Sequence, residues 1–268
     1  LTLSHLRCLW SAHSNRALDM SNTVETIKAS TTALNVLSRR GLSLHQADNP
    51  REIDTLMAHS EKSYLTASLS FRSNDFTKYN CMWVYLRDQN KQVCGIAGLR
   101  TDDIPPKGWV SFWAHHYERT SPFGTGKIDT AASPPIADEI SGRCTYIGDL
   151  WLRTTSRVDI PAFAITLQAL AVTTVNADWV YSFVRHQHAM RGQAQNFRLS
   201  RTYPGVHRWT SEPAPHRHDT DWLLCSNRAD IAYAMRTYAK NEHGAEASAT
   251  EDLCQPTLLN FSRNAATG

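Results

Sequence analysis

The chain has 268 residues, of which 41% are hydrophobic and 20% are charged, and its formal net charge at pH 7 is +3. This composition is ordinary for a globular protein with a buried core, and a mild, dispersed charge argues against a nucleic-acid partner. No apolar run reaches the roughly 18 residues that a membrane span needs, so we expect no membrane partner. The six cysteines form no CxxC pair, which favours reduced thiols and a cytoplasmic protein.

The two ends of the chain differ from its middle. Residues 1–40 are expected to form a loosely attached N-terminal arm that contains one amphipathic helix. The apolar positions of that helix are Val24, Ile27, Leu34 and Leu37. The sequence begins at Leu1 without the features of a secretory signal, and one hypothesis places the working start at Met20. Residues 241–268 are small and polar and predict a disordered tail, which leaves 41–240 as the folded domain.

Residues 41 to 100 predict one strand, two helices and a hairpin. The strand covers 41–47, the helices cover about 50–59 and 63–71, and the hairpin pairs strands at 81–87 and 92–100. In the first helix the inward positions are Ile53, Leu56 and Met57. Residues 101–144 form a long connection, in which 109–117 alternates like a further strand and 120–133 has the composition of a mobile loop.

The most informative stretch is a strand, a helix and a second strand between residues 145 and 185. The apolar run at 145–152 predicts a buried strand, the spacing from Ile160 onward predicts a helix, and 178–185 predicts the second strand. Asp159 can cap the helix, and Pro161 suits its first turn. The loop before the helix is therefore a natural anion site, because unpaired amides and the helix dipole both favour negative charge there.

The rest of the domain completes the sheet. We expect a short helix at 186–195, strands at 206–210 and 221–226, and a last helix at 230–240.

This order of elements resembles the acyl-CoA-dependent N-acyltransferases of the GNAT superfamily. The resemblance implies an α/β (α+β) fold whose mixed, mostly antiparallel central sheet is splayed between its fourth and fifth strands and flanked by helices. The superfamily's pyrophosphate motif reads Gln or Arg, two residues, Gly, one residue, then Gly or Ala. Here Arg157 and Ala162 fit that motif, whereas Ile160 replaces its first glycine and Pro161 removes one amide.

The resemblance implies acetyl-CoA or another acyl-CoA as co-substrate. The residues that it places along the fourth strand and at the helix start are Leu150, Leu152, Arg153, Arg157, Asp159 and Ala162. The two arginines could replace lost amide contacts by charge-assisted ones, and the alternative is that both are solvated loop residues.

A second motif of the superfamily contains the usual general-acid tyrosine. In this chain Gln193 stands at that position, between Ala189 and Phe197, and an amide cannot give up a proton. Another group or water must then protonate the leaving thiolate.

Three sets of residues are candidates for the chemistry. Asp149 interrupts the apolar strand where the splay is expected and could act as a base, or it could be a structural aspartate bonded to nearby backbone. His186 or His188 could act as acid or base, the alternative being polar loop residues. The third set is aromatic and lies in the segment that usually covers the substrate side; its members are Trp109, Trp113 and Tyr117. These side chains could line an acceptor pocket, or they could belong to the hydrophobic core.

The sequence thus predicts an N-acyltransferase that transfers an acyl group, acetyl foremost, to a primary amine by direct attack. The acceptor is expected to be a small-molecule or peptide amine, and a homodimer stays open. The histidine pairs lack the spacing of known zinc motifs, so no metal site is predicted. The alternative is a catalytically silent GNAT-like domain that binds a ligand or protein through the same cleft.

Overall fold

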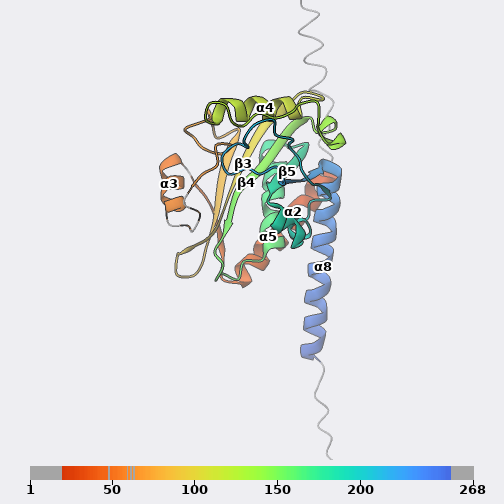
Figure 1. The fold of residues 1–268 in the computed structure, drawn as a ribbon. Coiled ribbons are helices and arrows are strands. Elements are labelled where there is room, and N and C mark those ends of the chain that lie inside the picture. The colour runs from red at the N-terminus through yellow and green to blue at the C-terminus, as the bar shows by residue number, and fades with distance from the viewer. Residues whose placement is uncertain (1–19, 48, 59, 61, 63, 255–268) are drawn as a thin grey trace, which may run out of the picture.

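The computed structural model describes residues 20–254 with the exception of 48, 59, 61 and 63 (Figure 1). Its centre is one seven-stranded sheet in the order β1-β2-β3-β4-β5-β7-β6. The strands are β1 (Ser43–Gln46), β2 (Cys81–Arg87), β3 (Val93–Ile104), β4 (Gly142–Leu152), β5 (Trp179–Val184), β6 (Arg201–Tyr203) and β7 (Trp222–Asn227). Neighbouring strands are antiparallel except for the central pair β4 and β5, which is parallel.

Helices cover both faces of this sheet (Figure 1). They are α2 (Met20–Arg39), α3 (Pro50–Ala58), α4 (Trp109–Thr120), the 3-10 turn η1 (Pro135–Asp138), α5 (Ile160–Val175), α6 (His186–Met190), α7 (Gln193–Phe197) and α8 (Arg228–Cys254). One core cluster joins the sheet to α2, α5 and α8, and a second cluster, rich in aromatic rings, joins it to α3, α4 and η1.

This architecture confirms the predicted fold class. The parallel pair β4–β5 is linked by α5, and that helix begins at Ile160 with Asp159 as its N-cap, as the sequence predicts. The hairpin of β2 and β3 is also confirmed, and so are the buried positions of α3, namely Ile53, Leu56 and Met57. The chain therefore has the mixed, mostly antiparallel central sheet that the sequence predicts, with one parallel pair at its centre.

The strand predicted at 109–117 is wrong, because this segment is helix α4. Its buried residues are Trp109, Val110, Trp113, His116 and Tyr117, which recur at helical spacing. Aromatic and β-branched residues favour strands in isolation, but here five side chains on one helical stripe are buried against the sheet, and burial outweighs propensity.

Other element predictions need smaller corrections. Residues 64–71 form turns and no helix, and the predicted strand at 206–210 is irregular, since the edge strand β6 lies at 201–203. The single helix predicted at 186–195 is divided into α6 and α7 by Gly192, whose φ is +80°. Helix α8 continues to Cys254, beyond the predicted end at 240, and residues 255–268 lie outside the described residues.

Residues 20–39 are not a loosely attached arm, because α2 packs into the first core cluster. The helix buries Ala29, Ala33, Val36 and Leu37. The predicted apolar face is wrong for Val24, Ile27 and Leu34, which are 47%, 55% and 38% exposed. Ala29 and Ala33 belong to the same core cluster as the buried residues of α5, and a prediction based on large apolar side chains does not include such alanines. Residues 1–19 lie outside the described residues.

No described helix combines the length and the apolar character that crossing a membrane would require.

Candidate active site

The central feature of the site is an opening between β4 and β5. The two strands pair only over Cys144–Tyr146 and Trp179–Tyr181, and no register pair follows although both strands continue. Beyond this point β4 stays paired with β3, and β5 stays paired with β7. The sheet is therefore splayed at its centre, between the fourth and fifth strands.

A β-bulge in β4 lies at the start of the splay. Ile96 pairs with Trp151 and Gly98 pairs with Gly148, so β4 contains one more residue than β3 between these pairs. Within the bulge Asp149 has a φ of +51°, in the left-handed region that few residues other than glycine adopt. Such a bulge leaves one residue out of the ladder, so a backbone amide of β4 can face the opening.

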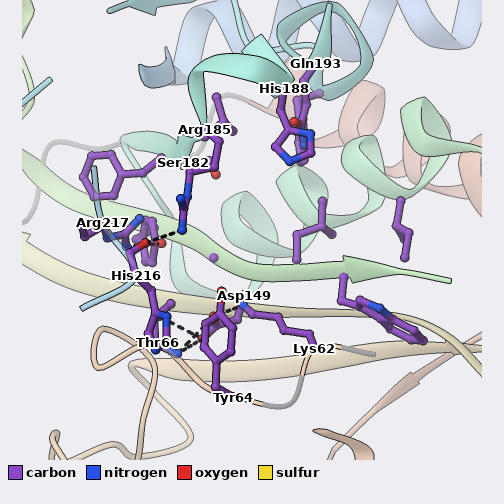
Figure 2. A pocket seen from close by; sticks show the side chains of 18 residues that line it. Lys62, Tyr64, Thr66, Asp149, Ser182, Arg185, His188, Gln193, His216 and Arg217 are labelled. Carbon is purple, nitrogen blue, oxygen red and sulfur yellow. Dashed lines mark hydrogen bonds and ion pairs between the residues drawn. The ribbon is translucent and has the colours of Figure 1, made fainter. Parts of the chain in front are cut away.

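The splay opens into a cleft of about 410 Å³ (Figure 2). One wall is β4 from Gly148 to Leu152, and the other is the end of β5 from Ser182 to Val184 together with Arg185, which follows it. Tyr146 of β4 also lines the cleft, and the further lining residues come from loops and short helices; they are Lys62, Tyr64, Thr66, His188, Gln193, Phe197, His216 and Arg217. Four distant segments of the chain thus meet at one place.

Asp149 anchors the loop around residues 62–66 to the wall of the cleft (Figure 2). Its carboxylate accepts hydrogen bonds from Lys62 Nζ, from the Thr66 amide at 3.1 and 3.2 Å, and from Thr66 Oγ1 at 3.0 Å. The side chain of Asp149 is fully buried and that of Lys62 is 15% exposed. With both carboxylate oxygens engaged, the geometry favours the structural alternative for Asp149 over a role as base.

Two basic groups at this end of the cleft have lowered proton affinity. Burial lowers the pKa of Lys62 below its ordinary value, and the carboxylate of Asp149 opposes this shift. Partial burial, reinforced by the neighbouring cations Lys62 and Arg185, lowers the pKa of His216. The His216 ring stacks on Tyr64 with centroids 3.7 Å apart. A neutral imidazole that faces the cleft can accept a proton.

Arg217 lies beside these groups, against the aromatic cluster under α4. It donates a 2.8 Å hydrogen bond from Nη2 to the hydroxyl of Tyr146. Its guanidinium carbon is 4.8 Å from the ring centroid of Phe183 and 5.7 Å from that of Tyr146. These rings hold a cation in place, because their faces carry negative charge density.

The start of α5 offers fewer free amides than the sequence motif implies. Pro161 has no N–H, and the amide of Ala162 donates to Asp159 Oδ1 at 3.0 Å. Asp159 also accepts a 2.9 Å hydrogen bond from Arg40. Arg153 donates to Gln92 at 2.8 Å, whereas Arg157 is exposed. A phosphate at this helix start would therefore depend on loop amides and on Arg157.

The structure brings some of the predicted site residues together and leaves others apart. Four of them line the cleft, namely Asp149, Leu150, Leu152 and His188, and Gln193 also lines it. His186 does not line it, and the Nδ1 of His186 is 3.2 Å from the indole nitrogen of Trp222. The aromatic residues proposed for an acceptor pocket are in the core and do not line the cleft; they are Trp109, Trp113 and Tyr117.

The sequence patterns gave no site role to four basic residues that line the cleft, Lys62, Arg185, His216 and Arg217. Lys62 and Arg217 lie in loops separated by more than 150 residues, and no spacing rule connects them. The polar loop 211–220, with two histidines and an arginine, carried the one available signal. Within the described part of the chain, no group of three or more metal-ligating side chains could hold a metal ion.

No family model matches the sequence, and no curated protein matches it. Among solved structures the chain is similar to NAA60 of Arabidopsis thaliana in complex with acetyl-CoA, with 14% identity, 69% of this chain and 98% of that chain covered, and a TM-score of 0.40. FeeM, an N-acyl amino acid synthase from uncultured soil microbes, is 10% identical over 71% and 92% of the two chains, with a TM-score of 0.41. Spermidine N-acetyltransferase of Vibrio cholerae in complex with CoA and spermine is 9% identical over 71% and 98%, with a TM-score of 0.37. These similarities identify no acceptor and no acyl group for this chain.

Proposed function

We propose that the protein is an acyl-CoA-dependent N-acyltransferase that transfers an acyl group, acetyl foremost, to a primary amine by direct attack. The observation that carries the proposal is the splay of β4 and β5, with a bulge at Asp149 and a cleft that extends between the two strands. A thioester placed in this opening would have an amide-bearing strand on one side and basic groups on the other.

In this proposal the bulged segment of β4 stabilises the reaction. A backbone amide freed from the ladder donates to the carbonyl oxygen as negative charge develops on it. The side chains of Leu150 and Leu152 pack on the α5 face and form an apolar wall for the acyl-CoA arm. Arg157 and the loop amides before α5 would bind its pyrophosphate, with Ile160 and Pro161 limiting how many amides take part.

The proton of the attacking ammonium must be removed before the amine can react. His188 and His216 both line the cleft, and the lowered pKa of His216 keeps its ring neutral at pH 7, ready to accept that proton. Asp149 would contribute by holding Lys62 and the loop of Thr66 in position. Since Gln193 cannot protonate the leaving thiolate, Lys62 or water takes this role.

The alternative is a catalytically silent domain that binds a ligand or protein through the same cleft. It is favoured by the start of α5, where Pro161 lacks an amide and Asp159 occupies the amide of Ala162, and by Gln193 at the position of the usual acid.

Calorimetric titration with acetyl-CoA and with a longer acyl-CoA tests the proposal. We expect micromolar binding that weakens about tenfold in Arg157→Ala, because one charge-assisted contact to phosphate is lost. Arg157 is exposed, so the variant should fold normally, and Arg51→Ala, an exposed arginine on α3, is the matched control. Absence of binding by both acyl-CoA molecules would favour the silent domain.

A further inference from the structure

The residues that line the cleft near Lys62 and Arg217 carry more positive than negative charge, and one buried carboxylate behind the lining, Asp221, acts on both arginines of that lining. Three basic side chains line the cleft, Lys62, Arg185 and Arg217, and Asp149 is the one carboxylate among its described lining residues. Asp149 is engaged by Lys62 and Thr66. The two guanidinium groups therefore face the cleft without a carboxylate from its lining.

Arg217 is the better placed of the two arginines. Of its five N–H donors, the structure gives one a side-chain acceptor, the hydroxyl of Tyr146. The buried carboxylate of Asp221 acts on Arg217 by its charge, but among the described residues no carboxylate forms an ion pair with this guanidinium within 4.0 Å. The ring contacts with Phe183 and Tyr146 fix the plane of the group, and a fixed guanidinium suits the two oxygens of a carboxylate.

Arg185, directly after β5, supports this arrangement. Its Nη2 donates to the carbonyl oxygen of His216 at 3.1 Å, which ties the end of β5 to the loop that carries Arg217 (Figure 2). The nearest carboxylate, Asp221, is 3.9 Å from Arg185 Nε and does not line the cleft. Two guanidinium groups and a neutral His216 are thus gathered at one end of the opening.

We propose that the acceptor of this protein is an amine that also carries a carboxylate, as an amino acid does, and that Arg217 binds this carboxylate with Arg185 beside it. This inference rests on the proposed acyl transfer and names the class of its acceptor. The carboxylate pairs with the guanidinium, and the amino group faces the thioester near the bulge at Asp149, within reach of His216.

Arg217 lies on one side of the sheet, and from this position we infer that the carboxylate belongs to the acceptor and not to the acyl group. Arg217 contacts rings of the aromatic cluster under α4, whereas Leu150 and Leu152 of the acyl-CoA wall pack on the α5 face. An acyl-CoA that starts at α5 therefore approaches from the opposite face. The alternative is that Arg217 binds a carboxylate at the end of the acyl group. The experiment below distinguishes a carboxylate of the acceptor from one of the acyl group.

The first arm of the experiment measures binding and needs no turnover. The probes are the N-acetyl derivatives of the twenty amino acids and their C-terminal primary amides, titrated by calorimetry into the full chain with and without coenzyme A. We expect at least one acid to bind tenfold or more tightly than its own amide. In Arg217→Gln this preference should fall below threefold, while Arg191→Gln, which alters an exposed arginine outside the cleft, should retain it.

The second arm measures coenzyme A release with amino acids and the matching amino acid amides, and with acetyl-CoA or succinyl-CoA as donor. We expect the acids to react with the higher kcat/KM, and Arg217→Lys to keep part of the preference because it keeps the charge but not the two-pronged geometry. Should Arg217→Gln misfold, the wild-type comparison of acid with amide still decides.

The outcomes separate the two proposals. If acyl-CoA binds but no acid is preferred over its amide in either arm, the acceptor assignment is wrong and acyl transfer stands. The wild type could instead prefer succinyl-CoA over acetyl-CoA, show no preference for acid acceptors, and lose the donor preference in Arg217→Gln. That result would assign the site to the acyl group and would also overturn the acceptor assignment. If no acyl-CoA binds, acyl transfer fails, whereas tight binding of an acid that depends on Arg217 would still support the carboxylate site.

Discussion

His207 should make the fold sensitive to acid. This histidine is 4% exposed, and within the described residues neither of its ring nitrogens has a hydrogen-bond partner. Its ring stacks on Trp109 with centroids 5.6 Å apart and meets the edge of Phe183 at 5.1 Å. Burial lowers the pKa of His207 from 6.5 to about 3, and the charge of Arg217 adds to the effect.

The sign and size of the effect follow from proton uptake. Between pH 6.5 and 3 the unfolded chain binds a proton at His207 and the native protein does not, so the free energy of unfolding falls as the pH falls. At about 1.4 kcal/mol for each pH unit, the loss at pH 5 is about 2 kcal/mol relative to pH 7. His116, with a pKa also lowered to about 3 by burial, adds a loss of similar size.

The assay is urea unfolding followed by tryptophan fluorescence at pH 5.0, 6.0 and 7.5. Between pH 7.5 and 5.0 we expect the free energy of unfolding of His207→Phe to fall by about half as much as that of wild type. The reason is that phenylalanine fits the ring stack and takes up no proton. His115→Phe, an exposed position on α4, is the control and should leave the loss unchanged. If His207→Phe loses as much stability as wild type, the acid sensitivity originates elsewhere.

Three further predictions concern the cleft and its rim. Asp149→Ala leaves Lys62 and Thr66 without their acceptor and should cost about 3 kcal/mol, or roughly 6–12 °C in Tm by calorimetry; an unchanged Tm would contradict the anchoring role. Asp159→Ala removes the cap of α5 and should cost about 1 kcal/mol in urea unfolding, yet tighten acyl-CoA binding because it frees the amide of Ala162; weaker binding would place the phosphates elsewhere. Gly148→Ala puts a Cβ within about 2.6 Å of the Tyr146 hydroxyl and should lower Tm by several degrees, which a wild-type Tm would refute.

Local patterns in the sequence were sufficient to predict the elements whose stabilising contacts are close in the chain. Asp159 and Pro161 mark the start of α5 because a cap and a missing N–H act within one helical turn. The segment from Trp109 to Tyr117 has strand-like composition and still forms a helix, because the aromatic cluster on the sheet buries one helical stripe. Rules based on neighbouring residues do not include this burial, because the residues of the sheet that cover the helix are distant in the sequence.

The site was predictable only where it lies on the central strands. Asp149 stands out as a charge within an apolar run, and the structure places it in the bulge at the splay. Its role could not be read from the sequence, because the partners Lys62 and Thr66 come from a loop more than 80 residues away. The role of Arg217 could not be predicted for the same reason, since this loop residue depends on contacts with Tyr146 of β4 and Phe183 of β5.

Because β4 and β5 pair over a short length, part of each strand has an unpaired edge in the interior of the sheet. Within the described residues, the ladder between β4 and β5, which joins the half formed by β1 to β4 to the half formed by β5 to β7, contains three residue pairs. Exposed strand edges usually lie at the rim of a sheet, where they invite pairing with other chains. Here two such edges face each other inside one molecule, so an extended ligand with amide groups of its own would act as an eighth strand. Its binding should slow hydrogen exchange of the backbone amides of β4 and β5 together, and it should make the two half-sheets move as one body.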